Sequence, residues 1–126
     1  MSCFQCLFCN DYNEVDQRIT IPDIIQGTVH KIIDAVNIIV SYKIENSNNF
    51  YHYYIRLSNI TPFPETQTVA IKALSELLLC KQVTVQNINN FNYNSMDAKV
   101  FYNNICINNW VVYNKFAHHN PLDYKR

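Results

Sequence analysis

The sequence predicts a mainly β protein with two or three helices, built as a five-stranded barrel of the oligonucleotide/oligosaccharide-binding (OB) type. Five short segments alternate apolar and polar residues, and two others repeat apolar residues at helical spacing. In chain order they give three strands, a helix, two strands and a helix. That order is the plan of an OB barrel with a helix after the third strand. Periodicity alone leaves several small α+β folds open.

The first three strands are predicted from alternation. The pattern at 27–33 is weak, and it places three side chains on one face: Val29, Lys31 and Ile33. The patterns at 36–44 and 51–58 are clearer, and the sequence ENSNN between them is a turn by composition. Because the chain has only one glycine, we expect asparagine to occupy the tight turns.

A loop and a helix follow the third strand. Pro62 and Pro64 forbid regular strand pairing, so we expect a loop over residues 59–68. Apolar residues at 70–78 repeat at helical spacing, which predicts a helix with one buried face.

The sequence of the second half of the domain predicts two more strands and a helix. Residues 83–85 and 98–102 alternate like strands, and the asparagine-rich stretch 87–95 between them is expected to be a long polar loop. A second amphipathic helix begins at Ile107, and the tail from residue 118 is expected to be loose. Two aromatic residues near this helix are expected in the core: Trp110 and Phe116.

Length and charge limit the function classes. The chain has 126 residues, enough for one domain with its own core. We divide it into a cysteine-containing segment at 1–20, a barrel domain at 21–118 and a tail at 119–126. The formal net charge is +0, and the ten basic residues are dispersed along the chain. General affinity for nucleic acid is therefore not favoured by charge.

The sequence also suggests a location and a source. No segment has the length and apolarity of a membrane-spanning helix, and the start lacks the basic and apolar regions of a signal peptide. We therefore expect an intracellular, cytoplasmic protein with reduced cysteines and no membrane partner. Isoleucine, tyrosine, lysine and asparagine have AT-rich codons. An AT-rich genome, such as that of a large DNA virus or a protist, fits this composition, and a virion-associated protein is an alternative if the source is viral.

A family resemblance begins in the run GTVHKIIDAVNIIV. It resembles the G-x-V-x-x-V-x-D-G-D-T run of staphylococcal nuclease-like domains, with Gly27, Val29 and Asp34 in step. The resemblance covers roughly residues 24–118 and implies an OB barrel. The second acidic position, a calcium ligand in active members, falls on Val36. A valine offers no oxygen to a hard cation. From the residues alone, we expect Asp34 to form the bend between the first two strands.

The second family block, R-L-x-x-I-D-x-P-E, stands here as RLSNITPFPE. By resemblance, Arg56 matches the phosphate-contacting arginine and Glu65 follows a proline as the general base does, in a loop one residue longer. Thr61 replaces the second metal-binding aspartate. The third block, D-x-Y-G-R, reads FNYNS, so that Phe91 replaces the aspartate and Ser95 replaces the arginine that would stabilise the transition state.

These replacements imply a nuclease-shaped domain without catalysis. The closing V-N-x-x-L-V-x-x-G-x-A pattern survives as INNWVVYNKFA, a core-packing signature. Active members need a cation to polarise the phosphate and a basic group opposite it. The resemblance therefore implies a pseudo-nuclease, with no catalytic residue and with calcium not expected.

The N-terminal cysteines Cys3, Cys6 and Cys9 form C-x-x-C-x-x-C, a spacing used by zinc and iron–sulfur ligands. Three thiolates leave a tetrahedral set one ligand short. The fourth ligand would come from Cys80, Cys106, a histidine or a second subunit. The alternatives are an apolar start whose thiols are reactive or lie against a neighbour, and lipidation. We expect no cofactor, with zinc at these cysteines as the alternative, and we expect the adjacent histidines of the tail to be solvated.

One polar face of the barrel is the candidate binding surface. It carries four residues that suit stacking on bases or contact with a protein: Lys43, His52, Tyr54 and Arg56. The leading hypothesis is a non-catalytic interaction module with a protein or nucleoprotein partner. The alternatives are a divergent metal-dependent phosphodiesterase using Arg56 and Glu65, and a weak binder of single-stranded nucleic acid. The sequence gives no oligomeric state.

Overall fold

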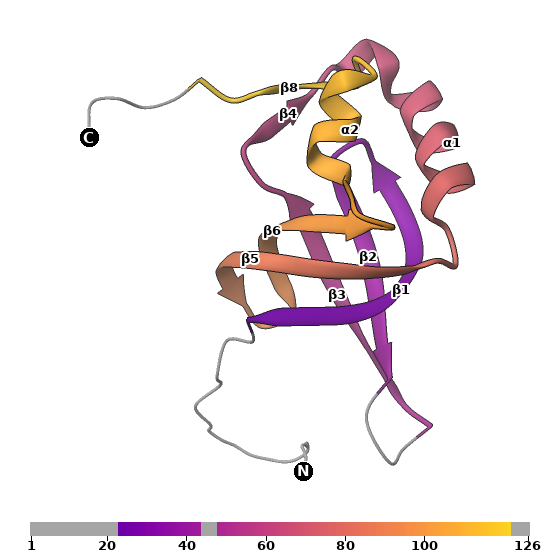
Figure 1. The fold of residues 1–126 in the computed structure, drawn as a ribbon, viewed down its shortest axis with the longest axis vertical. Coiled ribbons are helices and arrows are strands. Elements are labelled where there is room, and N and C mark those ends of the chain that lie inside the picture. The colour runs from indigo at the N-terminus through magenta and orange to yellow at the C-terminus, as the bar shows by residue number, and fades with distance from the viewer. Residues whose placement is uncertain (1–22, 44–47, 122–126) are drawn as a thin grey trace.

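A computed structural model of the chain describes residues 23–43 and 48–121, and the N-terminal cysteines lie outside these ranges. Five strands form a closed barrel (Figure 1): β1 (Ile24–Asp34), β2 (Asn37–Lys43), β3 (Phe50–Leu57), β5 (Gln82–Asn92) and β6 (Ser95–Tyr102). Three short strands accompany them: β4 (Ile60–Pro62), β7 (Ile105–Cys106) and β8 (Ala117–His119). The protein is therefore mainly β, as the sequence predicts.

The strand order gives the barrel its OB-like topology. Neighbouring strands run in the order β3-β2-β1-β5-β6, and β3 pairs with β6 to close the sheet. The closing pair is parallel, joining Tyr54–Leu57 to Ser95–Ala98, whereas the other barrel pairs are antiparallel. Parallel strands require a long crossover, and the helix-containing segment between β3 and β6 supplies it. Closure also removes most exposed strand edges.

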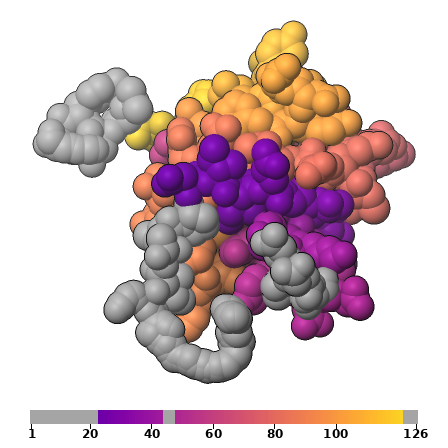
Figure 2. Space-filling view, turned by 60° about the horizontal axis from the view of Figure 1, so that its bottom comes forward, coloured from indigo at the N-terminus to yellow at the C-terminus, as the bar shows by residue number. Residues whose placement is uncertain are grey.

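Two α-helices and a 3-10 turn complete the domain: η1 (Pro64–Thr66), α1 (Gln67–Leu78) and α2 (Ile107–Tyr113). Both α-helices lie toward one end of the barrel, and the β2–β3 hairpin projects from the other end (Figure 1). Figure 2 shows β1, in indigo, crossing the surface between α2 and that hairpin. Within the described part of the chain, no helix has the length and apolar character needed to cross a membrane.

The inward faces of the barrel form one core, as the alternation predicts for β2 and β3. Four residues of these two strands are fully buried: Ile38, Val40, Ile55 and Leu57. Val36, in the turn before β2, is buried with them. α1 adds three buried residues at helical spacing: Ala70, Leu74 and Leu78. Trp110 and Phe116 pack against this core but are only half-buried, with ring centroids 6.0 Å apart.

The predicted faces of the first strand are wrong beyond Val29. A register shift between Val29 and Lys31 inserts one residue in the pairing of β1 with β2. Because side chains alternate with period two, one extra residue exchanges the two faces. Ile32 is therefore buried at 7% exposure, whereas Ile33 points outward at 41%.

The predicted polar loop at 87–95 is also wrong, because β5 continues to Asn92 and only Tyr93 and Asn94 form the turn. The β5–β6 pairing shifts register on both sides of Asn89, and Asn87 and Asn90 have positive φ. Asparagine tolerates this backbone region better than most residues. The asparagines here build bulges within a strand, a role that composition alone does not separate from a loop.

The predicted loop at 59–68 and the predicted loose tail contain short strands. β4 pairs antiparallel with β8, so that Thr61 lies opposite His118 and Ile60 opposite His119. Pro62 is tolerated because it sits at the end of a two-stranded ribbon. The tail is thus ordered through its two histidines. Asparagine does serve the turns as predicted, since five of the eight non-glycine residues with positive φ in the described ranges are asparagines.

Candidate functional site

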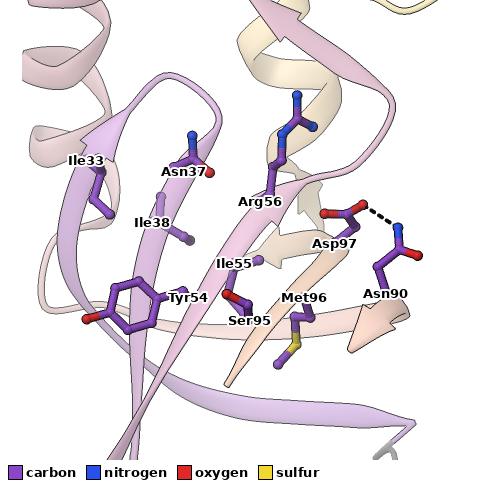
Figure 3. Close-up of a pocket in the computed structure, with 10 residues that line it drawn as sticks. All are labelled: Ile33, Asn37, Ile38, Tyr54, Ile55, Arg56, Asn90, Ser95, Met96 and Asp97. Carbon is purple, nitrogen blue, oxygen red and sulfur yellow. Dashed lines mark hydrogen bonds between the residues drawn. The ribbon is translucent and has the colours of Figure 1, made fainter. Parts of the chain in front are cut away.

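A hollow of about 280 Å³ opens on the barrel where β3 meets β6 (Figure 3). The strand register creates it, because Asn37 of β2 lies opposite Arg56 of β3, which in turn lies opposite Asp97 of β6. Six polar residues line the hollow: Asn37, Tyr54, Arg56, Asn90, Ser95 and Asp97. Ile33 and Met96 add apolar surface. We call this hollow the β3–β6 pocket.

Arg56 is held by backbone carbonyl groups at the end of β3 and at the start of β4. Its guanidinium donates to the carbonyl oxygens of Leu57 at 3.5 Å and Ile60 at 3.4 Å. Both contacts are long for hydrogen bonds and are therefore weak. Figure 3 shows the guanidinium pointing away from the Asp97 carboxylate. The side chain is thus oriented but keeps most of its donor capacity.

Asp97 accepts a hydrogen bond from the Asn90 amide at 2.7 Å (Figure 3). Among residues 23–43 and 48–121, it forms no ion pair, although the register places it next to Arg56. The pocket therefore offers a cation and a carboxylate on neighbouring strands, and the two groups make no direct contact with each other.

Asp34 shapes the rim beside Asn37. Its carboxylate accepts from the Val36 amide at 2.8 Å and from the Asn37 side-chain amide at 3.1 Å. This is the bend-forming role predicted for Asp34. The contact also fixes the Asn37 side chain at the edge of the pocket.

The four predicted binding residues share the outer face of the β2–β3 hairpin but do not all reach the pocket. Tyr54 and Arg56 line it, and Tyr54 is 45% exposed. His52 lies outside the lining, where its Nδ1 is 3.5 Å from the Ser41 hydroxyl. Lys43 is farther along the hairpin, paired with Phe50.

The positions taken from the family resemblance fall in different environments. Val36 is buried in the core at 1% exposure, and Thr61 bonds through its hydroxyl to the Asn120 side chain. Glu65 is exposed in η1, outside the pocket lining, whereas Ser95 lines the pocket beside Tyr54. Phe91 is half-buried against the core.

Sequence reasoning missed Asn37, Asn90 and Asp97 as pocket residues. The predicted fifth strand begins at Ala98, one residue after Asp97, and Asn90 falls within the predicted polar loop at 87–95. Asn37 lies opposite Arg56 through the β2–β3 register, whereas the β3–β6 register brings Asp97 to Arg56, and Asn90 reaches the pocket from β5 through its hydrogen bond to Asp97. A longer alternation count from Ser95 onward would have placed Asp97 on the outer face.

The tyrosines of the hairpin form a separate cluster. Tyr53 packs with Tyr42 at 6.4 Å and with Tyr51 at 6.2 Å between ring centroids. Burial raises the pKa of the Tyr53 hydroxyl above its ordinary value, and the neighbouring Tyr42 raises it further. Tyr53 therefore remains protonated at neutral pH and packs as a neutral ring.

Metal-binding side chains do not gather in the described part of the chain. Residues 23–43 and 48–121 contain no group of three or more histidine, cysteine, aspartate or glutamate residues suited to a metal ion. Cys80 is exposed and Cys106 half-buried, and both are free thiols. Cys3, Cys6 and Cys9 lie outside the described residues.

No model of a known protein family matches this chain, and no curated protein is similar to it in sequence.

Proposed function

We propose that this chain is a staphylococcal nuclease-like OB barrel without catalysis that binds a protein or nucleoprotein partner through the β3–β6 pocket and the adjoining face. The observation that carries the proposal is the burial of Val36 at 1% exposure, at the position where the resemblance requires a calcium-binding carboxylate. The barrel architecture supports the resemblance, and the chemistry of the replaced positions argues against hydrolysis.

The replaced positions lack the groups that phosphodiester hydrolysis needs. A hard cation is bound by carboxylate or carbonyl oxygens, and the side chain of Val36 has none. Thr61 is engaged with Asn120, and Glu65 lies outside the pocket that contains Arg56. A cation that polarises the phosphate and a base that activates the attacking water must lie around the same phosphate group. Arg56 without such partners is suited to binding.

The pocket has the features of a recognition site for a partner side chain. Interface anchors are typically inserted into desolvated pockets, and tyrosine and arginine are enriched around them. Tyr54 offers an exposed ring, and Ile33 adds apolar surface at 41% exposure. Arg56 and Asp97 supply a donor group and an acceptor group. A partner group that both accepts and donates hydrogen bonds could therefore bond to Arg56 and to Asp97 at the same time.

Digestion assays test the absence of catalysis. Plasmid and single-stranded DNA, incubated with calcium, magnesium or manganese, should remain intact at background level. Glu65→Ala serves as the matched variant, because Glu65 is the only retained candidate base. Turnover by the wild type that disappears in Glu65→Ala would identify a divergent phosphodiesterase and overturn the proposal.

A second candidate, weak binding of single-stranded nucleic acid, is favoured by the presence of Tyr54 and Arg56 in one pocket. Bases stack on exposed aromatic rings, and phosphates are neutralised by cations. Fluorescence titration with a labelled oligonucleotide at increasing salt separates this candidate, since phosphate binding weakens steeply with salt. Salt-sensitive binding that Tyr54→Ala abolishes would favour it over a protein partner.

Source and location complete the proposal. The AT-rich codons implied by isoleucine, asparagine, tyrosine and lysine fit an AT-rich genome, and a large DNA virus is the origin we propose, with a protist as the alternative. In the viral case the partner is a viral or host protein of the cytoplasm, or a virion component. Cross-linking in infected cells, followed by fractionation, would place the protein in one of these compartments.

A further inference from the structure

Two histidines meet on the outer face of the barrel, beside the pocket. His30 extends from β1 and His52 from β3, and their rings come together although β2 lies between those strands. The ring centroids are 4.7 Å apart and the ring planes are inclined at 80°. His30 is exposed and His52 is half-buried, so both rings are accessible from solvent. We call these two residues the histidine pair.

The separation of the two rings matches that of imidazoles sharing one metal ion. A zinc–nitrogen bond is about 2.0–2.1 Å, which puts the centre of a ligating imidazole roughly 3.2 Å from the ion. Two such rings at a tetrahedral angle have centroids about 5 Å apart. The observed 4.7 Å is close to this separation, and the inclined rings must turn so that one nitrogen of each faces a common ion.

The surroundings of His52 are compatible with the tautomer that such a site needs. The Ser41 hydroxyl lies 3.5 Å from His52 Nδ1 and comes from the residue directly opposite on β2. The hydroxyl can donate to Nδ1 or accept its proton, and in the tautomer in which it accepts, the Nε2 lone pair is free for a metal. Oxygen acceptors on the non-ligating nitrogen orient histidine ligands in this way in metal sites.

The β2–β3 ladder fixes His52 before any ion arrives, whereas His30 is the extra residue at the β1 bulge. His52 lies in the continuous β2–β3 ladder, and its carbonyl oxygen accepts from the Asn94 side chain at 2.9 Å. His30 lies at the register shift of β1, next to Val29, which is paired with β2. Ligands fixed on rigid strands lose little freedom on binding.

We propose that His30 and His52 form a two-histidine site for a transition-metal ion of the zinc class. Imidazole suits zinc, copper and nickel rather than calcium or magnesium. Two of four tetrahedral positions are filled by the pair, and two remain for water or for ligands from a partner. The histidine pair lies outside the pocket lining, so this site does not depend on the proposed function.

The other two histidines of the chain provide the control. His118 and His119 are adjacent on β8, and side chains of adjacent strand residues point to opposite faces. His118 packs against Phe63 with ring centroids 5.1 Å apart. Replacing His119 removes an exposed imidazole without touching the pair.

The test is a zinc titration of the full chain carrying Cys3→Ser, Cys6→Ser and Cys9→Ser, so that the N-terminal thiols cannot compete. Competition with a chromophoric zinc indicator should give about one zinc per chain. His52→Gln should weaken zinc binding at least about tenfold, equivalent to ~1.4 kcal/mol, whereas His119→Gln should change it less than about twofold. Equal weakening by both variants, or no zinc binding, would overturn the proposal.

Histidine ring proton spectra provide a readout that needs no histidine variant. Zinc should shift the signals of two of the four histidines and leave the other two unchanged. Assignment of the shifted signals to His30 and His52 supports the site. Shifts confined to His118 and His119, or equal shifts of all four, contradict it.

Discussion

Asn108 joins α2 to the barrel through three hydrogen bonds. Its side-chain oxygen accepts from the Val100 amide at 3.1 Å, and its amide donates to the Ser58 and Ala98 carbonyls at 3.2 Å each. Within residues 23–43 and 48–121, it is the only buried polar side chain. The carboxamide is suited to this place because it has both a donor and an acceptor.

Replacing Asn108 by alanine should lower the free energy of unfolding by about 2–4 kcal/mol. The Val100 amide would be left buried without an acceptor, and such an unsatisfied group is costly. Chemical denaturation monitored by circular dichroism measures the change. Asn109→Ala is the matched control, because Asn109 is exposed, and it should stay within about 0.5 kcal/mol of the wild type. A similar loss in both variants would contradict this role of Asn108.

Gly27, the single glycine of the chain, permits the close approach of β1 to β2. A Cβ at this position would lie 2.5 Å from the Ser41 carbonyl oxygen and 2.7 Å from Val40 Cγ1. We expect Gly27→Ala to destabilise the domain by about 1–3 kcal/mol, because the backbone must shift to relieve the overlap. Gln26→Ala, at the exposed neighbouring position, is the control in thermal unfolding. An unchanged melting temperature for Gly27→Ala would contradict this, because it would show that β1 and β2 can move apart without a loss of stability.

α1 contributes to stability through one face. Leu74 is fully buried among core residues, whereas Val69 is 61% exposed on the same helix. Leu74→Ala should cost about 2–5 kcal/mol, since it removes buried methyl groups and leaves a cavity. Val69→Ala should change the free energy of unfolding by less than about 0.5 kcal/mol. Comparable costs measured for the two variants by denaturation would mean that α1 is not packed as described.

At the scale of single elements, prediction succeeds where alternation is uninterrupted and fails at bulges. β2, β3 and α1 have regular patterns, and their buried faces follow the sequence. β1 and β5 each contain register shifts, which insert residues without any apolar signal. The asparagines of β5 have positive φ within a strand, and composition alone assigns such residues to a loop.

The residues of the pocket could be predicted only in part, because some come together only when the whole barrel closes. Tyr54 and Arg56 were predictable as outward residues of one strand, because side-chain alternation alone decides that. Asp97 and Asn90 join them only through the closing β3–β6 pair and the bulged β5. Long-range register depends on packing across the whole barrel, which local periodicity does not encode. The fold class was therefore predictable, and the composition of the pocket only in part.

The domain should fold without residues 1–20. The core is built from residues beginning at Ile25, and β1 starts at Ile24. Apolar burial within the barrel is the main driving force, so removal of the preceding segment should leave its content of secondary structure unchanged. Circular dichroism and the melting temperature of the truncated chain check this. Insoluble or molten truncated protein would instead show that the cysteine segment completes the core.

The central claim is that the barrel binds a partner through the β3–β6 pocket without cleaving nucleic acid. Its most direct test is affinity capture from the native source with three baits: wild type, Tyr54→Ala and Tyr113→Ala. Tyr54 lines the pocket, whereas Tyr113 is 83% exposed on α2 and outside the pocket lining. A partner recovered by wild type and Tyr113→Ala, and bound at least about tenfold more weakly by Tyr54→Ala, is the result we predict. Partners bound equally by all three baits would contradict the claim.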